Sequence, residues 1–214
     1  VPPEWNVKEA WIKDSIGNII ADFRVNNLHL LGYSEKFSGH LNLNELKEHL
    51  YSLPEQPEVI PYLTSYYKKR WGFCISHNQL INLKEGTYEV LIDSELDKDG
   101  SMTIGESILE GDTDEEILLS TYICHPSMAN NELSGPLIAS FIYKKLKEKK
   151  YRRYTYRILF VPETIGSIYY LSRHGDHLKN KLSAGFVITC AGDKGNFTYK
   201  RSREGKTVTD RASV

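Results

Sequence analysis

The sequence predicts an α/β fold, and three apolar runs in its second half are the main reason. Each run ends abruptly in a short polar cluster, and helical segments lie between the runs. The runs are residues 117–124, 154–161 and 186–191. This pattern is typical of parallel strands that are covered on both faces. Ligands bind beyond the carboxyl ends of the strands in such sheets, so His125, Glu163 and Asp193 are expected at one shared edge.

Composition limits the classes of function. Of the 214 residues, 40% are hydrophobic, which is enough for one domain of ordinary size or one domain with an insertion. The 27 Lys and Arg residues nearly balance the 28 Asp and Glu residues. Neither nucleic acid nor an acidic membrane surface is therefore an expected partner. No apolar run approaches the roughly 20 residues that are needed to span a bilayer.

The three cysteines are Cys74, Cys124 and Cys190, an odd number without close spacing. They favour reduced, buried thiols over a disulfide framework, which is typical of a cytoplasmic protein. Cys124 precedes His125, but neighbouring side chains on a strand point to opposite faces. A catalytic thiol is therefore not expected.

The first half predicts a mainly β region. A hairpin is expected at residues 11–23, a strand at 27–33, and a second hairpin from residues 86–96 and 101–109. A short helix is expected over residues 43–53, with its start at Asn44 and its end before Pro54.

The second half predicts two helices between its strands, after a polar stretch at residues 112–116. In residues 134–149, Ser134 is a candidate cap and Pro136 lies in the first turn. Lysines near the end of this segment suit the negative end of the helix dipole. Residues 165–182 supply the second helix.

The polar cluster after the first of the three strands is the most specific segment. His125 follows the strand, and the turn and helix after it bring Asn131 or Glu132 near the imidazole. Histidine and carboxylates at one sheet edge are what a metal-assisted hydrolase needs. The same pattern is also typical of a loop with asparagine turns and a hydrogen-bonded histidine. Spacing alone leaves both interpretations open.

Glu163 follows the second strand, and Gly166 leaves room for a helix to begin close by. In a hydrolase, Glu163 would be the general base that takes a proton from water. The alternative is an exposed acid that favours a helix N-terminus. If the hydrolase interpretation holds, the side chains of His125 and Glu163 should lie within about 8 Å of each other.

Several segments, in order, resemble a bacterial aminopeptidase-like family of unknown function. They are residues 2–6, 61–67, 71–74, 124–130, 162–166 and 189–193. In that family a small domain is inserted into a zinc exopeptidase fold and a winged helix follows. It is distantly related to the co-catalytic zinc aminopeptidases, whose histidine and A-D-D/N-x-S-G motif residues 124–135 resemble.

The resemblance implies a partial three-layer α/β sandwich of the zinc aminopeptidase type, incomplete at the C-terminus. Residues 1–7 and 112–214 would form the peptidase-like core, and residues 8–111 an inserted mainly β domain. Members of the family often belong to surface-polysaccharide gene neighbourhoods.

Departures from the aminopeptidase pattern imply a reduced metal site. Asn131 stands where an aspartate bridges two metals, and an amide oxygen is a weaker ligand than a carboxylate. Thr164 and Thr189 stand at two further ligand positions, with Asp193 as a substitute for the second. The distal histidine ligand would lie beyond the last residue. The resemblance thus implies one zinc ion, with His125, Asn131 and Asp193 as ligands, or none within this fragment.

The expected function is a zinc-dependent aminopeptidase-like hydrolase of a peptide or amide bond, with Glu163 as base. Its partner would be a small peptide-like or amide-containing substrate, with no membrane and no nucleic acid bound through this fragment. A homo-oligomer is compatible with the sequence. The alternative is a catalytically impaired binding module in surface polysaccharide biosynthesis. The three missing carboxylates favour the module, and the retained His125 and Glu163 favour the enzyme.

Overall fold

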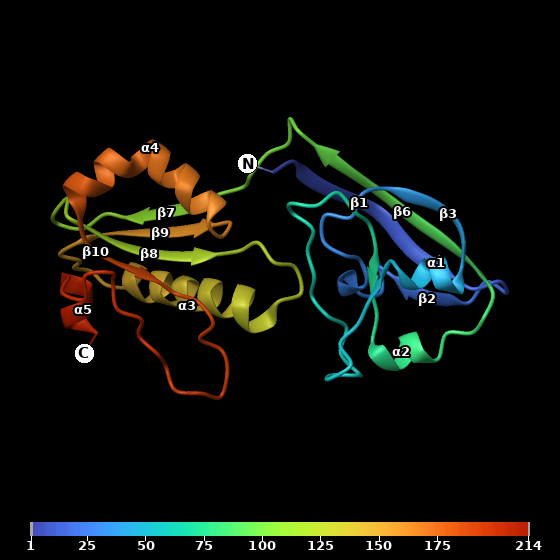
Figure 1. Cartoon of the computed structure of the whole chain (residues 1–214). Helices are drawn as coiled ribbons and strands as arrows, with labels where there is room; N and C mark the ends of the chain where they lie inside the picture. The colour runs from blue at the N-terminus through green and yellow to red at the C-terminus, as the bar shows by residue number, and fades with distance from the viewer. Residues whose placement is uncertain (1, 214) are drawn as a thin grey trace. The chain divides into compact units, whose positions relative to one another are not determined.

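A computed structural model describes residues 2–213, which form two compact units (Figure 1). The first unit runs to Ser101 and the second begins at Met102. Between residues 2 and 213, no helix combines the length and the apolar character that crossing a membrane requires. The expected α/β fold with a β-rich first half is confirmed, while the exact bounds of an inserted domain stay a prediction.

The first unit is built on an antiparallel sheet with the strand order β2-β1-β6-β3. Its strands are β1 (Glu4–Lys13), β2 (Ile19–Asp22), β3 (Phe37–Asn42) and β6 (Thr87–Asp97). β1 and β2 form the hairpin that the sequence predicts. In its turn, the Asp14 carboxylate accepts hydrogen bonds from the backbone N–H groups of Ile16 and Asn18.

Short elements complete the core of the first unit. They are η1 (Asn27–His29), α1 (Leu43–Lys47), β4 (Leu50–Tyr51), β5 (Phe73–Cys74) and α2 (His77–Ile81). The strand expected at residues 27–33 is wrong, because the Asn26 side chain caps a 3-10 helix there. The helix expected from Asn44 starts at Leu43, since the Asn42 side chain accepts from the Glu45 N–H and caps it.

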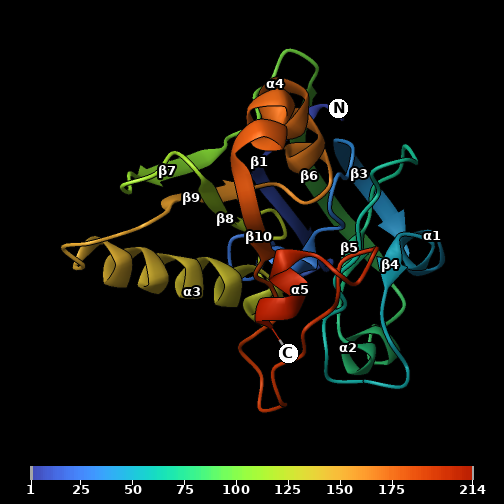
Figure 2. The ribbon, with the colours of Figure 1, turned by 90° about the vertical axis from the view of Figure 1, so that its left-hand side faces the viewer.

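The second unit is a four-stranded sheet between two helices, with the strand order β10-β8-β9-β7. Its strands are β7 (Gly105–Leu109), β8 (Glu116–Tyr122), β9 (Thr155–Val161) and β10 (Leu182–Val187). β10, β8 and β9 are parallel neighbours, as predicted. Its helices are α3 (Ala129–Lys147), α4 (Ile165–Lys181) and α5 (Val208–Ala212). Figures 1 and 2 show α3 and α4 on opposite faces of this sheet.

Three local predictions in the second half need correction. β7 pairs antiparallel with β9 and not with residues 86–96, so the second expected hairpin is wrong. β10 ends at Val187, earlier than the predicted strand. α3 begins at Ala129, and Ser134 is not its cap, because its hydroxyl donates to the Asn130 carbonyl within the helix.

Two glycines allow the helices to start close to the strands. A Cβ on Gly135 would lie 2.2 Å from Thr121 Oγ1 on β8. A Cβ on Gly166 would lie 2.7 Å from Pro162 Cδ, which confirms the close helix start predicted there. Both helices therefore begin at the edge where the parallel strands end.

Candidate functional site

The loops after β8, β9 and β10 carry an unusual concentration of strained backbone. Ser127, Thr164 and Cys190 have φ angles of 67°, 59° and 49°. A positive φ is uncommon for a residue other than glycine, and especially for β-branched threonine. Such conformations cost about 1–3 kcal/mol each and gather at functional sites. One strained residue therefore follows each of the three parallel strands, at the edge where the sequence predicts a site.

His125 and Glu163 meet at this edge. His125 Nε2 lies 2.8 Å from Glu163 Oε2, so the predicted proximity of the two side chains is confirmed. The histidine side chain is 20% exposed and the glutamate side chain 48% exposed. A substrate can therefore reach the carboxylate, while the imidazole is held largely within the loop.

The backbone around Thr164 fixes the position of Glu163. The N–H of Ile165 donates to the Glu163 carbonyl at 2.6 Å, and Thr164 has φ 59° and ψ −70°. Together these define a γ-turn of the rare, strained type with positive φ. α4 starts directly from this turn, so the base predicted from sequence stands at the rigid start of a helix.

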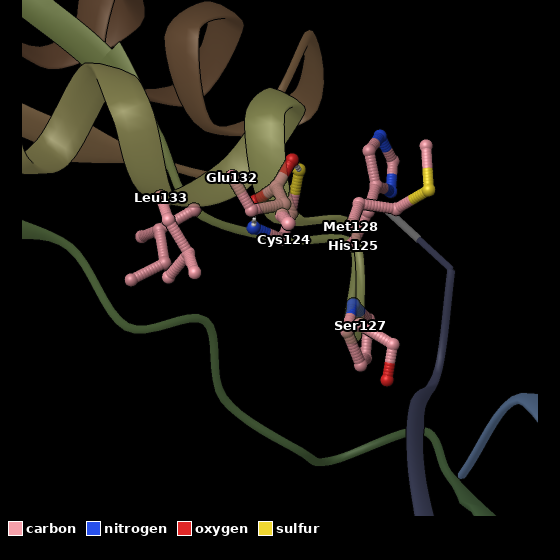
Figure 3. A pocket seen from close by; sticks show the side chains of 9 residues that line it. Cys124, His125, Ser127, Met128, Glu132 and Leu133 are labelled. Atoms are coloured by element: carbon pink, nitrogen blue, oxygen red, sulfur yellow. Dashed lines mark hydrogen bonds between the residues drawn. The ribbon is translucent and has the colours of Figure 1, made fainter. Parts of the chain in front are cut away.

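Cys124 and Glu132 join His125 at the same point (Figure 3). One donor atom from each of the three side chains lies within 4.8 Å of the others. Strand alternation predicts that Cys124 faces away from His125, and this is wrong because β8 already ends at Tyr122. The sequence places Glu132 near the imidazole but gives no sign of its burial.

Hydrogen bonds orient the cysteine and the glutamate. The Cys124 N–H donates to Glu132 Oε2, and the Cys124 thiol lies 3.9 Å from Glu132 Oε1. The Glu163 N–H donates to Cys124 Sγ at 3.2 Å. Burial raises the pKa of the Cys124 thiol to about 11, and the nearby carboxylates of Glu132 and Glu163 act in the same direction. The thiol is therefore protonated at neutral pH, which agrees with the expectation that it is not a nucleophile.

A cavity of about 460 Å³ adjoins these donors, and Figure 3 shows the side chains that line it. Its apolar lining residues are Ile123, Pro126, Met128, Ala129 and Leu133. Its polar lining residues are Cys124, His125, Ser127 and Glu132. The donor group therefore adjoins an open, mainly apolar pocket.

Asn131 and Asp193 belong to other hydrogen-bond sets. The Asn131 amide donates to the Tyr122 hydroxyl at 3.2 Å, while its Oδ1 is buried without a hydrogen-bond partner in the described structure. Asp193 is exposed, and its carboxylate accepts from the Asn130 amide at 3.3 Å and the Gly195 N–H at 2.6 Å. The three-donor group around His125 contains neither residue, and their roles as ligands stay a prediction.

The donor atoms that converge near His125 have the chemistry to hold one zinc-type ion. Thiol, imidazole and carboxylate groups are all zinc ligands, and three of them converge near His125. Asn131, Thr164 and Thr189, which stand where the sequence resemblance implies carboxylate ligands, carry no charge. Thr189 instead donates a hydrogen bond to Tyr122.

The fold is a peptidase-like α/β fold of the zinc aminopeptidase type. The structure matches that of a zinc aminopeptidase from Bacillus subtilis with a TM-score of 0.54 and 10% identity, over 89% of this chain and 60% of the other. It matches a peptidase M28 precursor from Shewanella amazonensis with a TM-score of 0.55 and 11% identity, over 86% and 58% of the two chains. At such low identity the likeness shows the fold alone.

The particular family follows from the sequence match. Residues 4–214 match the family described as a domain of unknown function, DUF4910, and the chain belongs to that family. It is 49% identical over 211 residues to a Clostridium acetobutylicum protein provisionally named for polysaccharide biosynthesis and an aminopeptidase-like domain. That match covers 99% of this chain and 48% of the relative.

The structure also matches a crystal structure from Clostridium acetobutylicum that is described as that of a peptidase. The TM-score is 0.94 and the sequence identity is 48%. The match covers 99% of this chain and 49% of the other. The chain thus spans about half the length of these two relatives.

Proposed function

We propose that this chain carries the hydrolytic site of a zinc-dependent, aminopeptidase-like enzyme that cleaves a peptide or amide bond. The observation that carries the proposal is the 2.8 Å contact between His125 and Glu163 beyond the parallel strands. Zinc held by His125, with Asn131 and Asp193 as the further ligands predicted from sequence, would polarise the carbonyl and lower the pKa of water. The free cysteines support a cytoplasmic location as part of the proposal.

Glu163 acts as the general base in this proposal. Its exposed carboxylate accepts a proton from the attacking water, which forms a bond to the carbonyl carbon. The same carboxyl group then returns the proton to the leaving amine as the carbon–nitrogen bond breaks. The strained turn at Thr164 supports this role because it holds the carboxylate in one position.

A binding module is the second candidate, and the neutral residues at the edge favour it. Asn131 and Thr189 share the Tyr122 hydroxyl in a hydrogen-bond set where charged ligands are expected. Such a module would use the peptidase fold to recognise a peptide or a glycan precursor. The name of the Clostridium relative supports a setting in polysaccharide biosynthesis for either candidate.

Glu163→Gln separates the two candidates. Glutamine keeps the size of the side chain but cannot accept a proton at neutral pH. We expect turnover of an aminoacyl-amide panel to fall by about 10²–10⁴-fold, the usual worth of a positioned base. Metal content and thermal stability should not change, whereas His125→Ala should lose both metal and activity.

The assay is best made on a form that spans the full length of the relatives. Glu148→Gln is the matched control, because Glu148 is an exposed residue that pairs with Lys145 at the surface. Unchanged turnover in Glu163→Gln would refute the hydrolase and favour the binding module.

A further inference from the structure

We propose that Cys124, His125 and Glu132 form a metal site that binds one zinc-like ion. This inference rests on the proposed function, because His125 is common to both. It puts Cys124 and Glu132 in the two ligand places that the sequence resemblance gives to Asn131 and Asp193. The donor atoms of Cys124, His125 and Glu132 lie within 4.8 Å of one another. All three residues lie in the segment between the end of β8 and the first turn of α3.

The spacing of the donors is close to what zinc requires. Zinc bonds of about 2.3 Å to sulfur and about 2.0–2.2 Å to nitrogen or oxygen place tetrahedral ligand atoms about 3.3–3.8 Å apart. Cys124 Sγ and Glu132 Oε1 are already 3.9 Å apart. The widest pair is no more than 4.8 Å apart, so a movement of about 1 Å would close the set. Cys124 and His125 lie in a loop without regular structure, which can make such a movement.

The burial and the negative charge of Glu132 favour a bound cation. Only 5% of its surface is exposed, and its hydrogen bonds come from the N–H and the thiol of Cys124. Within residues 2–213, no Lys, Arg or His forms an ion pair with it. A buried carboxylate without an opposite charge is costly, and a bound cation supplies that charge.

Neighbouring groups already orient the donors, as the outer ligands of metal sites do. The Glu163 N–H points at Cys124 Sγ from 3.2 Å and would stabilise a thiolate there. Glu163 Oε2, at 2.8 Å from Nε2, fixes the His125 ring. On binding, the metal replaces the thiol proton of Cys124, which leaves to solvent. A set of sulfur, nitrogen and oxygen donors favours zinc or cobalt(II) over magnesium or calcium.

Cobalt(II) alone is the probe, because a cobalt–thiolate bond gives a charge-transfer absorption in the near ultraviolet. Titration of the metal-free full chain with Co²⁺ should produce this band. Cys124→Ser should abolish it, and Cys190→Ser, which alters an exposed thiol outside the donor group, should keep it. Glu132→Gln should weaken Co²⁺ binding by at least about 10–100-fold, the cost of losing even an outer-shell partner.

Circular dichroism of each variant checks that it folds, and Glu132→Gln tests the site independently if Cys124→Ser does not fold. A Co²⁺ complex without a thiolate band, or unchanged affinity in Glu132→Gln, would overturn the ligand assignment. If turnover depends on Glu163 but Co²⁺ gives no thiolate band, the ligand assignment is overturned and the proposed function stands. A band that appears without hydrolysis of any substrate would support the metal site and overturn the proposed function.

Discussion

Each end of the second sheet contains a buried carboxylate, but the carboxylate at one end has an ion-pair partner and the carboxylate at the other end has none within the described residues. Glu116, at the amino end of β8, is 4% exposed, and Glu132, beyond the carboxyl end of β8, is 5% exposed. Glu116 is paired with Arg157, whereas no cation within the described chain pairs with Glu132. Charge and burial therefore do not by themselves mark a site. The missing counter-charge and the strained loops distinguish the carboxyl end.

Arg157 is the centre of the paired cluster at the amino end. Its Nε and Nη2 donate to the two oxygens of Glu116 at 2.7 and 2.8 Å, and its Nη1 donates to Glu106. Tyr170 and His177, both on α4, bond to Glu106 and Glu116. The cluster joins β7, β8 and β9 to α4, and so fixes the helix that begins just after Glu163.

The largest stability effect is expected from Arg157→Met. Removing one partner of a buried ion pair leaves the other charge uncompensated, so we expect a loss of about 3–5 kcal/mol in the free energy of unfolding. Arg173→Met is the matched control, because Arg173 is an exposed residue on α4, the helix that the cluster holds, and its loss should change stability little.

Urea denaturation measured by circular dichroism follows α3 and α4. The three tryptophans, Trp5, Trp11 and Trp71, all lie in the first unit, so their fluorescence follows that unit separately. An equal, small loss in both arginine variants would mean that the cluster does not anchor α4.

A smaller, pH-dependent effect should come from the same cluster. Hydrogen bonds from Arg157 hold the pKa of the Glu116 carboxyl below its usual range. A folded-state pKa below the unfolded one stabilises the protein above the ordinary carboxyl pKa, and this contribution is lost as pH falls through the folded value. Stability should therefore fall with acid in the native protein and fall less in Glu116→Gln. Urea midpoints at stepwise lower pH measure this, and parallel curves would contradict it.

The sequence could predict the parallel strands and the meeting of His125 with Glu163, because both depend only on apolar runs and sheet topology. The burial of Glu132 depends on how α3 begins, and that helix starts five residues before its predicted cap at Ser134. The pairing of β7 was also not predictable, because a good turn at residues 97–100 favours a local hairpin. Pairing with β9 places Glu106 beside Arg157, a contact across 51 residues of sequence.

Two glycines in helices should respond to alanine with opposite signs. In α3, a Cβ at Gly135 would meet Thr121 Oγ1 at 2.2 Å and the Ile188 carbonyl oxygen at 2.4 Å. Gly135→Ala should therefore cost about 1–3 kcal/mol through overpacking. Gly175, in α4, has open space at its Cβ position, so Gly175→Ala should gain about 0.5–1 kcal/mol. Thermal unfolding of both variants measures the difference, and a gain of stability in Gly135→Ala would contradict the close approach of α3 to β8.

A small net effect is expected from Thr164→Gly, which tests whether the backbone at the functional edge is strained. Glycine accepts positive φ without strain, so it removes about 1–3 kcal/mol of backbone strain. It also costs about 0.5–1 kcal/mol in added freedom of the unfolded chain, and the net result should be a gain of about 1 kcal/mol in the free energy of unfolding. Thr103→Gly, at an exposed loop residue outside the positive-φ set, should show only the loss.

In Thr164→Gly, turnover should fall although the free energy of unfolding rises. The γ-turn holds Glu163 at the start of α4, and a glycine there lets the turn relax and the carboxylate move. A more stable protein with slower turnover would show that the strain at Thr164 serves to position the base. If Thr164→Gly instead lost stability to the same extent as Thr103→Gly, the turn would store no strain, and its place beside Glu163 would carry no functional meaning.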